Sequence, residues 1–252
     1  MKAIIVAAGV GSRLGDLTKN LPKPLLDVNG KSILEHQIEL FHKFGIKDVI
    51  IIRGPHKEKF HFDNVRYIED TDYQNHDLLG SLMMASKEMN DDLIISYGDI
   101  IFDEKIMKKI ISFDDDAGLV IDLNWEKNYQ NKSKELIDKV SVTRIQNNFI
   151  DKIGYKKNMN LDNNVELAEF IGIMKFSKKV SQIFTKKFFE LETHHTGKFY
   201  DSPSLTFGII TDMIEDLITD KIKFLPISID GVWCEIDTVE DLQNAKKLFS
   251  KN

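Results

Sequence analysis

A short glycine-containing stretch with two cationic side chains is the part of this sequence best suited to chemistry. It spans residues 8–13, directly after an apolar run, and Lys23 follows ten residues later between Pro22 and Pro24. Glycine lets a backbone turn sharply and brings its N–H groups close to an anion. This combination predicts a polyphosphate-binding site. Its candidate binding residues are Ala8, Gly9, Gly11, Ser12, Arg13 and Lys23.

Two common phosphate-binding motifs do not match this stretch. The dinucleotide fingerprint needs a glycine at its sixth position, which here is Leu14, and Gly15 comes one residue late. That motif also expects an acidic residue after the next strand, where this sequence has Arg53. No glycine-lysine-serine or glycine-lysine-threonine motif has P-loop spacing, and no Gly-x-Ser-x-Gly occurs. A nicotinamide dehydrogenase and an α/β hydrolase are therefore disfavoured.

Three carboxylates that follow or end strand-like segments are candidate metal ligands. Open α/β sheets bind ligands beyond the carboxyl ends of their strands, and Asp99 follows an apolar run at such an end. A carboxylate beside a triphosphate suits magnesium binding, because bare anions repel each other. Glu235 and Asp237 share a face if the strand before them continues that far. From the residues alone, Asp99 could instead bond turn amides, and Asp237 or Thr238 could cap the next helix.

The elements that must position these residues alternate between strand and helix in the first half of the chain. Strands are predicted at 2–8, 48–52, 64–68 and 92–97, and helices at 31–44, 79–89 and 104–113. Ser32 with Glu35 is typical of a capping box, and Gly45 supplies a C-terminal stop. This pattern predicts a doubly wound βαβ arrangement.

The second half of the chain mixes short strands with polar segments. Polar segments cover 126–138 and 156–164, and Asn147-Asn148 marks a turn. Strands are predicted at 118–123, 139–145, 149–153, 169–176, 223–227 and 232–236, and helices at 180–191, 204–219 and 239–249. The predicted fold class is α/β, with a Rossmann-like, doubly wound, mixed and mostly parallel sheet, helices on both faces and a small β-rich insertion. We expect one domain, 1–252, with halves at 1–115 and 116–252.

Composition limits the classes of partner. A formal net charge of −6 argues against a general nucleic-acid binder, whose surface would be basic. The 252 residues contain one cysteine, Cys234, which excludes an internal disulfide and indicates a reducing compartment. No apolar run approaches the roughly 20 residues that span a bilayer. We therefore expect a soluble, cytoplasmic protein with no nucleic-acid or membrane partner.

At the level of motifs, the chain resembles the nucleotidyltransferases that activate phosphorylated small molecules with a nucleoside triphosphate. The resemblance rests on Ala7-Ala8-Gly9-Val10-Gly11-Ser12-Arg13-Leu14 followed by Pro22-Lys23-Pro24-Leu25. It is similar above all to the cytidylyltransferase branch, which includes phosphocholine, aminoalkyl-phosphonate and phosphoglutamine cytidylyltransferases. The resemblance implies that Arg13 meets the β- and γ-phosphates and that Lys23 meets the α-phosphate and the transition state. It also implies Mg²⁺ as cofactor, held by Asp99 and Asp237, with Glu235 as the other possible ligand in the second motif.

The resemblance also implies where the base and the acceptor bind. Base and ribose would meet Asn75, Gly80 and Ser81, although His76 and Asp77 depart from the small or amide residues commoner there. The candidate acceptor residues are Trp125, Glu169, Trp233 and Glu235, with Tyr129 as a further pocket residue. Choline would call for an aromatic cage with a carboxylate. An amino acid would call for an acid and a base, for which Glu169, Asp122 and Lys175 are available.

The function implied by the resemblance is transfer of CMP from CTP to a small phosphorylated acceptor, with release of pyrophosphate. The expected partners are CTP and this acceptor, and a homodimer is one open oligomeric state. A sugar-1-phosphate nucleotidyltransferase using UTP, dTTP or GTP is the alternative enzyme. A non-catalytic nucleotide-binding regulator is the alternative from another class.

Overall fold

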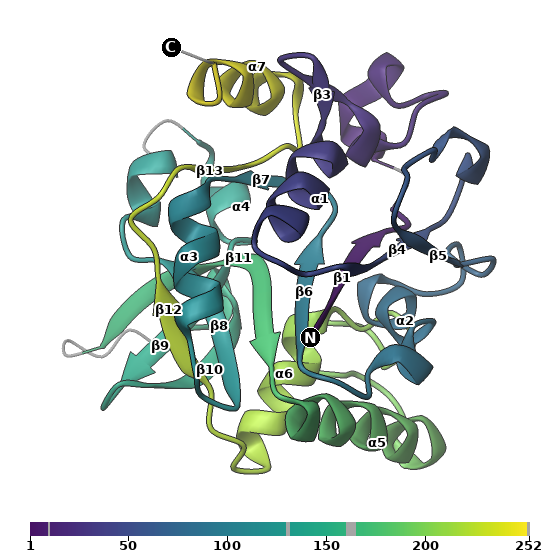
Figure 1. The fold of residues 1–252 in the computed structure, drawn as a ribbon. Helices are drawn as coiled ribbons and strands as arrows, with labels where there is room; N and C mark the ends of the chain where they lie inside the picture. The colour runs from purple at the N-terminus through teal and green to yellow at the C-terminus, as the bar shows by residue number, and fades with distance from the viewer. Residues whose placement is uncertain (10, 130–131, 160–164, 251–252) are drawn as a thin grey trace.

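The computed structural model describes residues 1–9, 11–129, 132–159 and 165–250. A nine-stranded sheet runs through it in the order β10-β9-β11-β6-β1-β4-β5, with β8 paired to β11 and β12 paired to β8 (Figure 1). The strands of this sheet are β1 (Lys2–Ala7), β4 (Asp48–Arg53), β5 (Arg66–Glu69), β6 (Leu93–Tyr97), β8 (Ala117–Asp122), β9 (Ser141–Gln146), β10 (Phe149–Tyr155), β11 (Glu166–Phe176) and β12 (Leu225–Ser228).

Most strands of the sheet point the same way. β1, β4, β5 and β6 pair in parallel, as do β8 and β12, whereas β11 pairs antiparallel with β6, β8 and β9. β10 pairs antiparallel with β9. Only β10 and β11 therefore oppose the common direction, and the predicted mixed, mostly parallel sheet is confirmed. Two small antiparallel sheets join β2 (Asp27–Val28) to β3 (Lys31–Ser32), and β7 (Ile100–Phe102) to β13 (Trp233–Glu235).

Helices cover both faces of the sheet. The α-helices are α1 (Ile33–Lys43), α2 (Leu78–Met83), α3 (Glu104–Ser112), α4 (Lys134–Ile137), α5 (Lys178–His194), α6 (Ile210–Thr219) and α7 (Val239–Leu248). Short 3-10 turns lie at Ser12–Leu17, Lys23–Leu25, Lys57–Lys59, Ser86–Glu88, Trp125–Tyr129 and Lys156–Asn158. No helix among the described residues has the length and apolar content required to cross a membrane.

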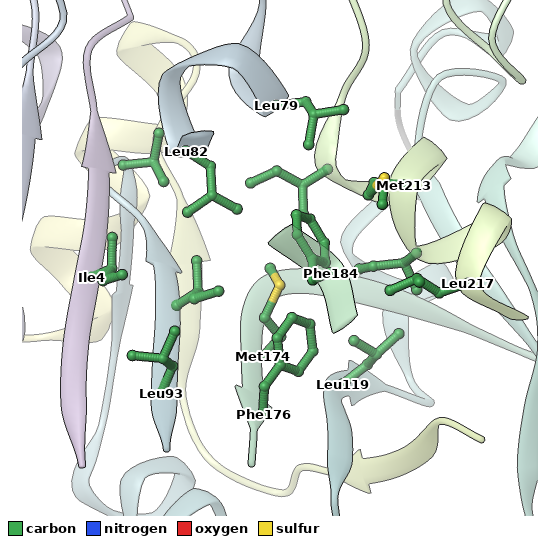
Figure 2. Packing of buried hydrophobic residues seen from close by; sticks show 14 of the residues in the cluster. Ile4, Leu79, Leu82, Leu93, Leu119, Met174, Phe176, Phe184, Met213 and Leu217 are labelled. Atoms are coloured by element: carbon green, nitrogen blue, oxygen red, sulfur yellow. The ribbon is translucent and has the colours of Figure 1, made fainter. Parts of the chain in front are cut away.

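The alternation of side chains along β1 divides the core into two layers. Ile4 and Val6 pack with residues of α2, α5 and α6, and Figure 2 shows part of this layer around Phe184. Ala3 and Ile5 face the opposite side, where α1 and α3 supply the apolar residues. A fully buried strand needs apolar residues on both faces, which explains the continuous apolar run at the start of the sequence.

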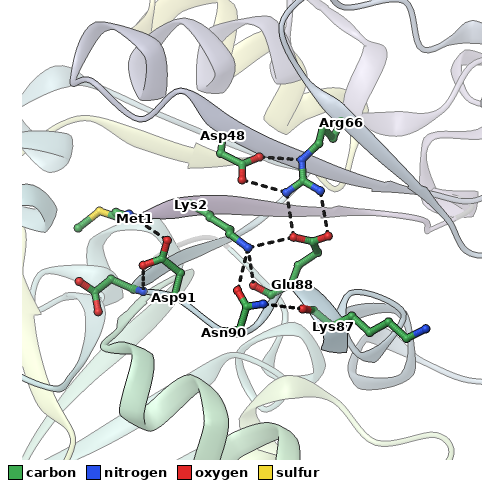
Figure 3. Close-up of polar contacts among 9 residues, drawn as sticks. Met1, Lys2, Asp48, Arg66, Lys87, Glu88, Asn90 and Asp91 are labelled. Carbon is green, nitrogen blue, oxygen red and sulfur yellow. Dashed lines mark hydrogen bonds and ion pairs between the residues drawn. The ribbon is translucent and has the colours of Figure 1, made fainter.

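Ion pairs tie the amino ends of the strands together, away from their carboxyl ends. Lys2 at the start of β1 donates to Glu88 at 3.0 Å, and Arg66 of β5 donates to both Asp48 and Glu88 (Figure 3). Arg66 is about half exposed, so this network contributes modestly to stability. These contacts connect the amino ends of the strands, whereas the glycine loop follows the carboxyl end of β1.

Several predicted boundaries are wrong; the strand predicted over 169–176, for example, begins at Glu166. The helix predicted from Ser204 begins only at Ile210, because Gly208 turns back to Leu205 and Asp212 accepts from the Ile209 amide to start the helix there. The helix predicted over 79–89 ends at Met83 and continues as a separate 3-10 turn. The strand predicted over 232–236 covers only Trp233–Glu235, the part that pairs with β7.

Candidate active site

Lys23 is the central cation of the site. It is 7% exposed, and its Nζ donates to Asp99 Oδ2 at 2.8 Å and to Asp237 Oδ1 at 2.5 Å. Burial lowers the pKa of Lys23, but the attraction of Asp99, Asp237 and Glu235 outweighs burial and leaves the pKa raised. The ammonium is therefore held charged by the carboxylates around it.

The pairing of β7 with β13 brings the three candidate carboxylates together. Ile100 lies opposite Glu235 in this pairing, and the Ile236 amide donates to the Asp99 carbonyl at 3.0 Å. One carboxylate oxygen from each of Asp99, Glu235 and Asp237 lies within 4.8 Å of the other two. Asp237 does not cap α7, because the hydroxyl of Thr238 accepts from the Asp241 amide instead. The carboxylate of Asp237 contacts Lys23 and Arg13 instead of the helix end.

The donor set of this cluster fits a magnesium ion. All three groups offer carboxylate oxygens, which are the ligands that magnesium prefers. Asp99 Oδ1 is buried and has no hydrogen-bond partner in the described structure, so it is an oxygen still to be satisfied. Burial, then repulsion from Asp237 and Asp99, raises the pKa of Glu235, whereas Lys23 lowers it. A divalent cation would relieve that repulsion.

The glycine loop lies beside Lys23. Gly11 has φ +63°, and a Cβ there would lie 2.8 Å from the Cβ of Lys23, so only glycine fits this close approach. Arg13 Nη1 lies 2.7 Å from Asp237 Oδ2, and its side chain is 65% exposed. Ala8 is buried at the end of β1, and Gly54 packs against its carbonyl. Val10 lies outside the described residues, and so does the side chain of Ser12.

A cavity of about 380 Å³ opens above these groups. Residues from distant parts of the chain line it. The glycine loop, Lys23 and Asp99 come from 1–115, and Glu235, Asp237 and other lining residues come from 116–252. Its principal lining residues are Gly9, Gly11, Arg13, Lys23, Asp77, Leu78, Tyr97, Asp99, Ser141, Tyr155, Ile209, Thr211, Glu235 and Asp237.

The residues expected at the base and ribose do not line this cavity. Ser81 is buried, and its hydroxyl donates to Asp70 at 2.7 Å. Gly80 packs under the ring of His76, which itself contacts Asp70. Asn75 is exposed and bonds Asp72. These side chains organise the loop before α2, and Asp77 and Leu78 at the start of that helix reach the cavity instead.

The expected acceptor residues differ in their position relative to this cavity. Glu235 lines the cavity. Glu169 does not line it. The Glu169 side chain is 3% exposed and accepts from the Tyr129 hydroxyl at 2.6 Å, whereas Glu169 Oε2 has no partner among the described residues. Burial, with repulsion from Asp122 opposed by the Tyr129 hydrogen bond, raises the pKa of Glu169 to about 8.

Neither tryptophan lines the cavity, and their expected contact with the acceptor stays a prediction. Trp125 is 2% exposed and packs against Val140, Val142 and Met159. The indole of Trp233 donates to Asp122 at 3.0 Å and packs on the core of α1 and α3. The aromatic lining residues are Tyr97 and Tyr155 instead.

Lys175, the base considered for an amino-acid acceptor, does not line the cavity either. Lys175 Nζ donates to the carbonyls of Ile111 and Phe113, at the far end of β11 from Glu169.

Some lining residues were not predicted from the sequence, namely Ser141, Tyr155 and Thr211. Hydroxyl residues in strands and helices without a motif carry no local signal of a site. Asp77 also lines the cavity, and the polar run around it was the sequence signal that could have identified it.

Comparison with known families decides the class of this protein. The model of the MobA-like NTP transferase domain matches residues 3–131, which hold β1, the glycine loop, Lys23 and Asp99. The chain belongs to this family. It is a nucleotidyltransferase, as the resemblance in its N-terminal motifs implied.

Among similar sequences are two cytidylyltransferases. A CTP:phosphoglutamine cytidylyltransferase of Campylobacter jejuni is 28% identical over 96% of this chain and 98% of its own length. A choline-phosphate cytidylyltransferase of Streptococcus pneumoniae is 39% identical, but over only 40% of this chain and 46% of its own length. The bifunctional protein GlmU of Methanococcus aeolicus is 31% identical over 100% of this chain, which spans 55% of that protein.

Solved structures share the fold. A putative glucose-1-phosphate thymidylyltransferase from Bacillus anthracis superimposes with a TM-score of 0.73 at 22% identity, covering 100% of this chain and 96% of that one. The CTP:phosphocholine cytidylyltransferase of Streptococcus pneumoniae gives 0.73 at 21% identity, covering 99% of both chains. The architecture is therefore common to enzymes with different nucleotides and acceptors.

Proposed function

We propose that the protein is a magnesium-dependent cytidylyltransferase. It transfers CMP from CTP to a small phosphorylated acceptor, such as phosphocholine, an aminoalkyl phosphonate or phosphorylated glutamine, and releases pyrophosphate. The observation that carries this proposal is the cluster of Lys23 with Asp99 and Asp237, set beside the glycine loop on the floor of one cavity. The similarity to a CTP:phosphoglutamine cytidylyltransferase along nearly the whole chain supports the same reaction.

The reaction needs orientation and charge neutralisation, with no covalent protein nucleophile. An oxygen of the acceptor's phosphate attacks the α-phosphorus of CTP, the bond from that phosphorus to the β-phosphate oxygen breaks, and pyrophosphate leaves. The backbone of the glycine loop and Arg13 bind the β- and γ-phosphates. Lys23 neutralises charge at the α-phosphate as the transition state forms. The exposed Arg13 is free to turn toward an incoming triphosphate.

The three carboxylates hold the cofactor in this proposal. Asp99 and Asp237, with Glu235 beside them, would ligate Mg²⁺. When bound, the ion neutralises the negative charges of the nucleotide and the acceptor. Glu235 also lines the cavity, where its carboxyl can accept a hydrogen bond from an acceptor that carries nitrogen.

Asp77 gives a physical reason for CTP over UTP or dTTP. Its carboxylate lines the cavity at the start of α2, next to the end of β1 where the glycine loop begins. A carboxylate accepts from the 4-amino group of cytosine, whereas uracil and thymine present a carbonyl oxygen there. We therefore expect Asp77→Asn to reduce the preference for CTP over UTP by about tenfold. Asp72→Asn, in the same loop but off the cavity, is the matched control and should leave the preference unchanged.

Pyrophosphate release tests the proposal. CTP, UTP, dTTP and GTP would each be combined with magnesium and with phosphocholine, 2-aminoethylphosphonate, amide-phosphorylated glutamine or glucose 1-phosphate. We expect release with CTP and a nitrogen-bearing acceptor, and Lys23→Ala should lower turnover about a hundredfold or more while the protein stays folded. Release confined to UTP or dTTP with glucose 1-phosphate would instead identify a sugar-nucleotide enzyme. Tight nucleotide binding with no release in any combination would favour a regulator.

A further inference from the structure

The amine of Lys23 engages the same aspartates that are the candidate metal ligands. Its Nζ contacts Asp99 Oδ2 and Asp237 Oδ1, and Arg13 contacts Asp237 Oδ2 at 2.7 Å. Of the four carboxylate oxygens on these two aspartates, three are thus engaged by cations of the protein itself. The fourth, Asp99 Oδ1, is buried and unpartnered in the described structure.

A divalent cation and the Lys23 ammonium therefore compete for one set of oxygens. The ligand atoms of the cluster lie within 4.8 Å of one another, which leaves little room for two separate cations. Like charges at such short range repel strongly when water is largely excluded, and the Lys23 side chain is only 9% exposed. Binding a metal in the absence of any other ligand would force the ammonium out with no anion to receive it.

The chain around Lys23 fixes its backbone but leaves its amine able to move. Pro22 and Pro24 restrict the backbone on either side. Gly11 packs against the Lys23 Cβ, so the glycine loop runs along the stem of the side chain. The four-carbon stem is flexible, so the amine can turn toward a neighbouring anion while the backbone stays in place.

We propose that Lys23 is a built-in counter-cation that keeps the metal site closed until nucleotide phosphates draw its amine away. This inference rests on the proposed function, because it takes a nucleoside triphosphate as the anion that receives the ammonium. Metal and nucleotide then bind with positive coupling, and each raises the affinity for the other by the same factor. Lys23 has two positions in this account, one on the aspartates and one on the α-phosphate.

Metal binding without nucleotide tests the proposal. Mn²⁺ would be titrated into the nucleotide-free protein, and free Mn²⁺ measured by electron paramagnetic resonance. We expect Lys23→Met to bind Mn²⁺ roughly tenfold or more tightly than the wild type, within the range usual for coupled ligands. Lys59→Met, which removes an exposed lysine that does not line the cavity, should match the wild type. Adding Asp99→Asn to Lys23→Met should abolish the gain. A folded Lys23→Met protein that binds Mn²⁺ no better than the wild type would overturn the proposal.

A second measurement uses the wild-type protein, in case Lys23→Met does not fold. The ¹⁵N signal of the Lys23 ammonium would be followed by NMR, assigned by its loss in a Lys23→Gln variant. We expect it to shift on addition of CTP alone and to stay in place on addition of millimolar Mg²⁺ alone. A shift with Mg²⁺ alone would overturn the proposal. Neither measurement requires turnover, so their failure is distinct from failure to release pyrophosphate.

Discussion

Glu169 makes the stability of this protein depend on pH in a way that one substitution should remove. The carboxyl is 3% exposed on β11, and only one of its oxygens has a partner, the Tyr129 hydroxyl, among the described residues. Burial raises its pKa to about 8, compared with an ordinary value of 4.5. Glu169→Gln keeps an oxygen that can accept from Tyr129 and removes the titration.

The sign of the effect follows from the two pKa values. Below pH 4.5 the carboxyl is protonated in both the folded and the unfolded chain, and its contribution to stability is complete. As the pH rises from 4.5 toward about 8, the unfolded chain loses this proton first, so the free energy of unfolding falls. Each tenfold difference in proton affinity is worth about 1.36 kcal/mol, so the total decrease is on the order of 5 kcal/mol.

Urea unfolding between pH 4.5 and 9 measures this decrease. We expect the free energy of unfolding of Glu169→Gln to exceed that of the wild type increasingly as the pH rises, and to level off above about pH 8. Glu126→Gln, an exposed residue of the same type, is the matched control and should follow the wild-type curve. Parallel curves for the wild type and Glu169→Gln would refute the reasoning, because they would mean that Glu169 titrates normally in the folded protein.

Two further substitutions test local features of the site and its support. Gly11→Ala places a Cβ 2.8 Å from that of Lys23 at a positive φ, so we expect a loss of about 1–3 kcal/mol in urea unfolding and weaker CTP binding by calorimetry; an unchanged affinity would contradict the tight fit. Ser32→Ala removes the hydroxyl that caps α1 and should cost about 1 kcal/mol with turnover unchanged, whereas a loss of turnover at equal stability would argue against a purely structural role.

The parts of the fold decided within a few residues were predictable from the sequence. The capping box of Ser32 and Glu35 is confirmed, with the Ser32 amide donating to Glu35 Oε2 at 2.6 Å. Asn147 and Asn148 both adopt positive φ, 51° and 66°, as a tight turn between β9 and β10 requires. Such signals need no knowledge of the rest of the chain.

The assembly of the site depends on contacts that no local signal reports. Lys23 and Asp237 are 214 positions apart, and the β7–β13 pairing decides that they meet. The residues alone left Asp237 open between a metal ligand and a helix cap, and only the resemblance favoured the ligand. Trp125 is a second case, because its burial against Val140, Val142 and Met159 depends on packing partners that its own polar segment does not reveal.

The most direct test of nucleotidyl transfer is the fate of the α-phosphorus of CTP. CTP labelled with ³²P at the α position would be incubated with magnesium and each nitrogen-bearing acceptor, and the products separated by chromatography. The account predicts that the label appears in the CMP-linked acceptor and that the released pyrophosphate is unlabelled. Label recovered only as free CMP would mean hydrolysis. Transfer to the acceptor from γ-labelled CTP, with none from the α position, would mean a kinase and would contradict the account.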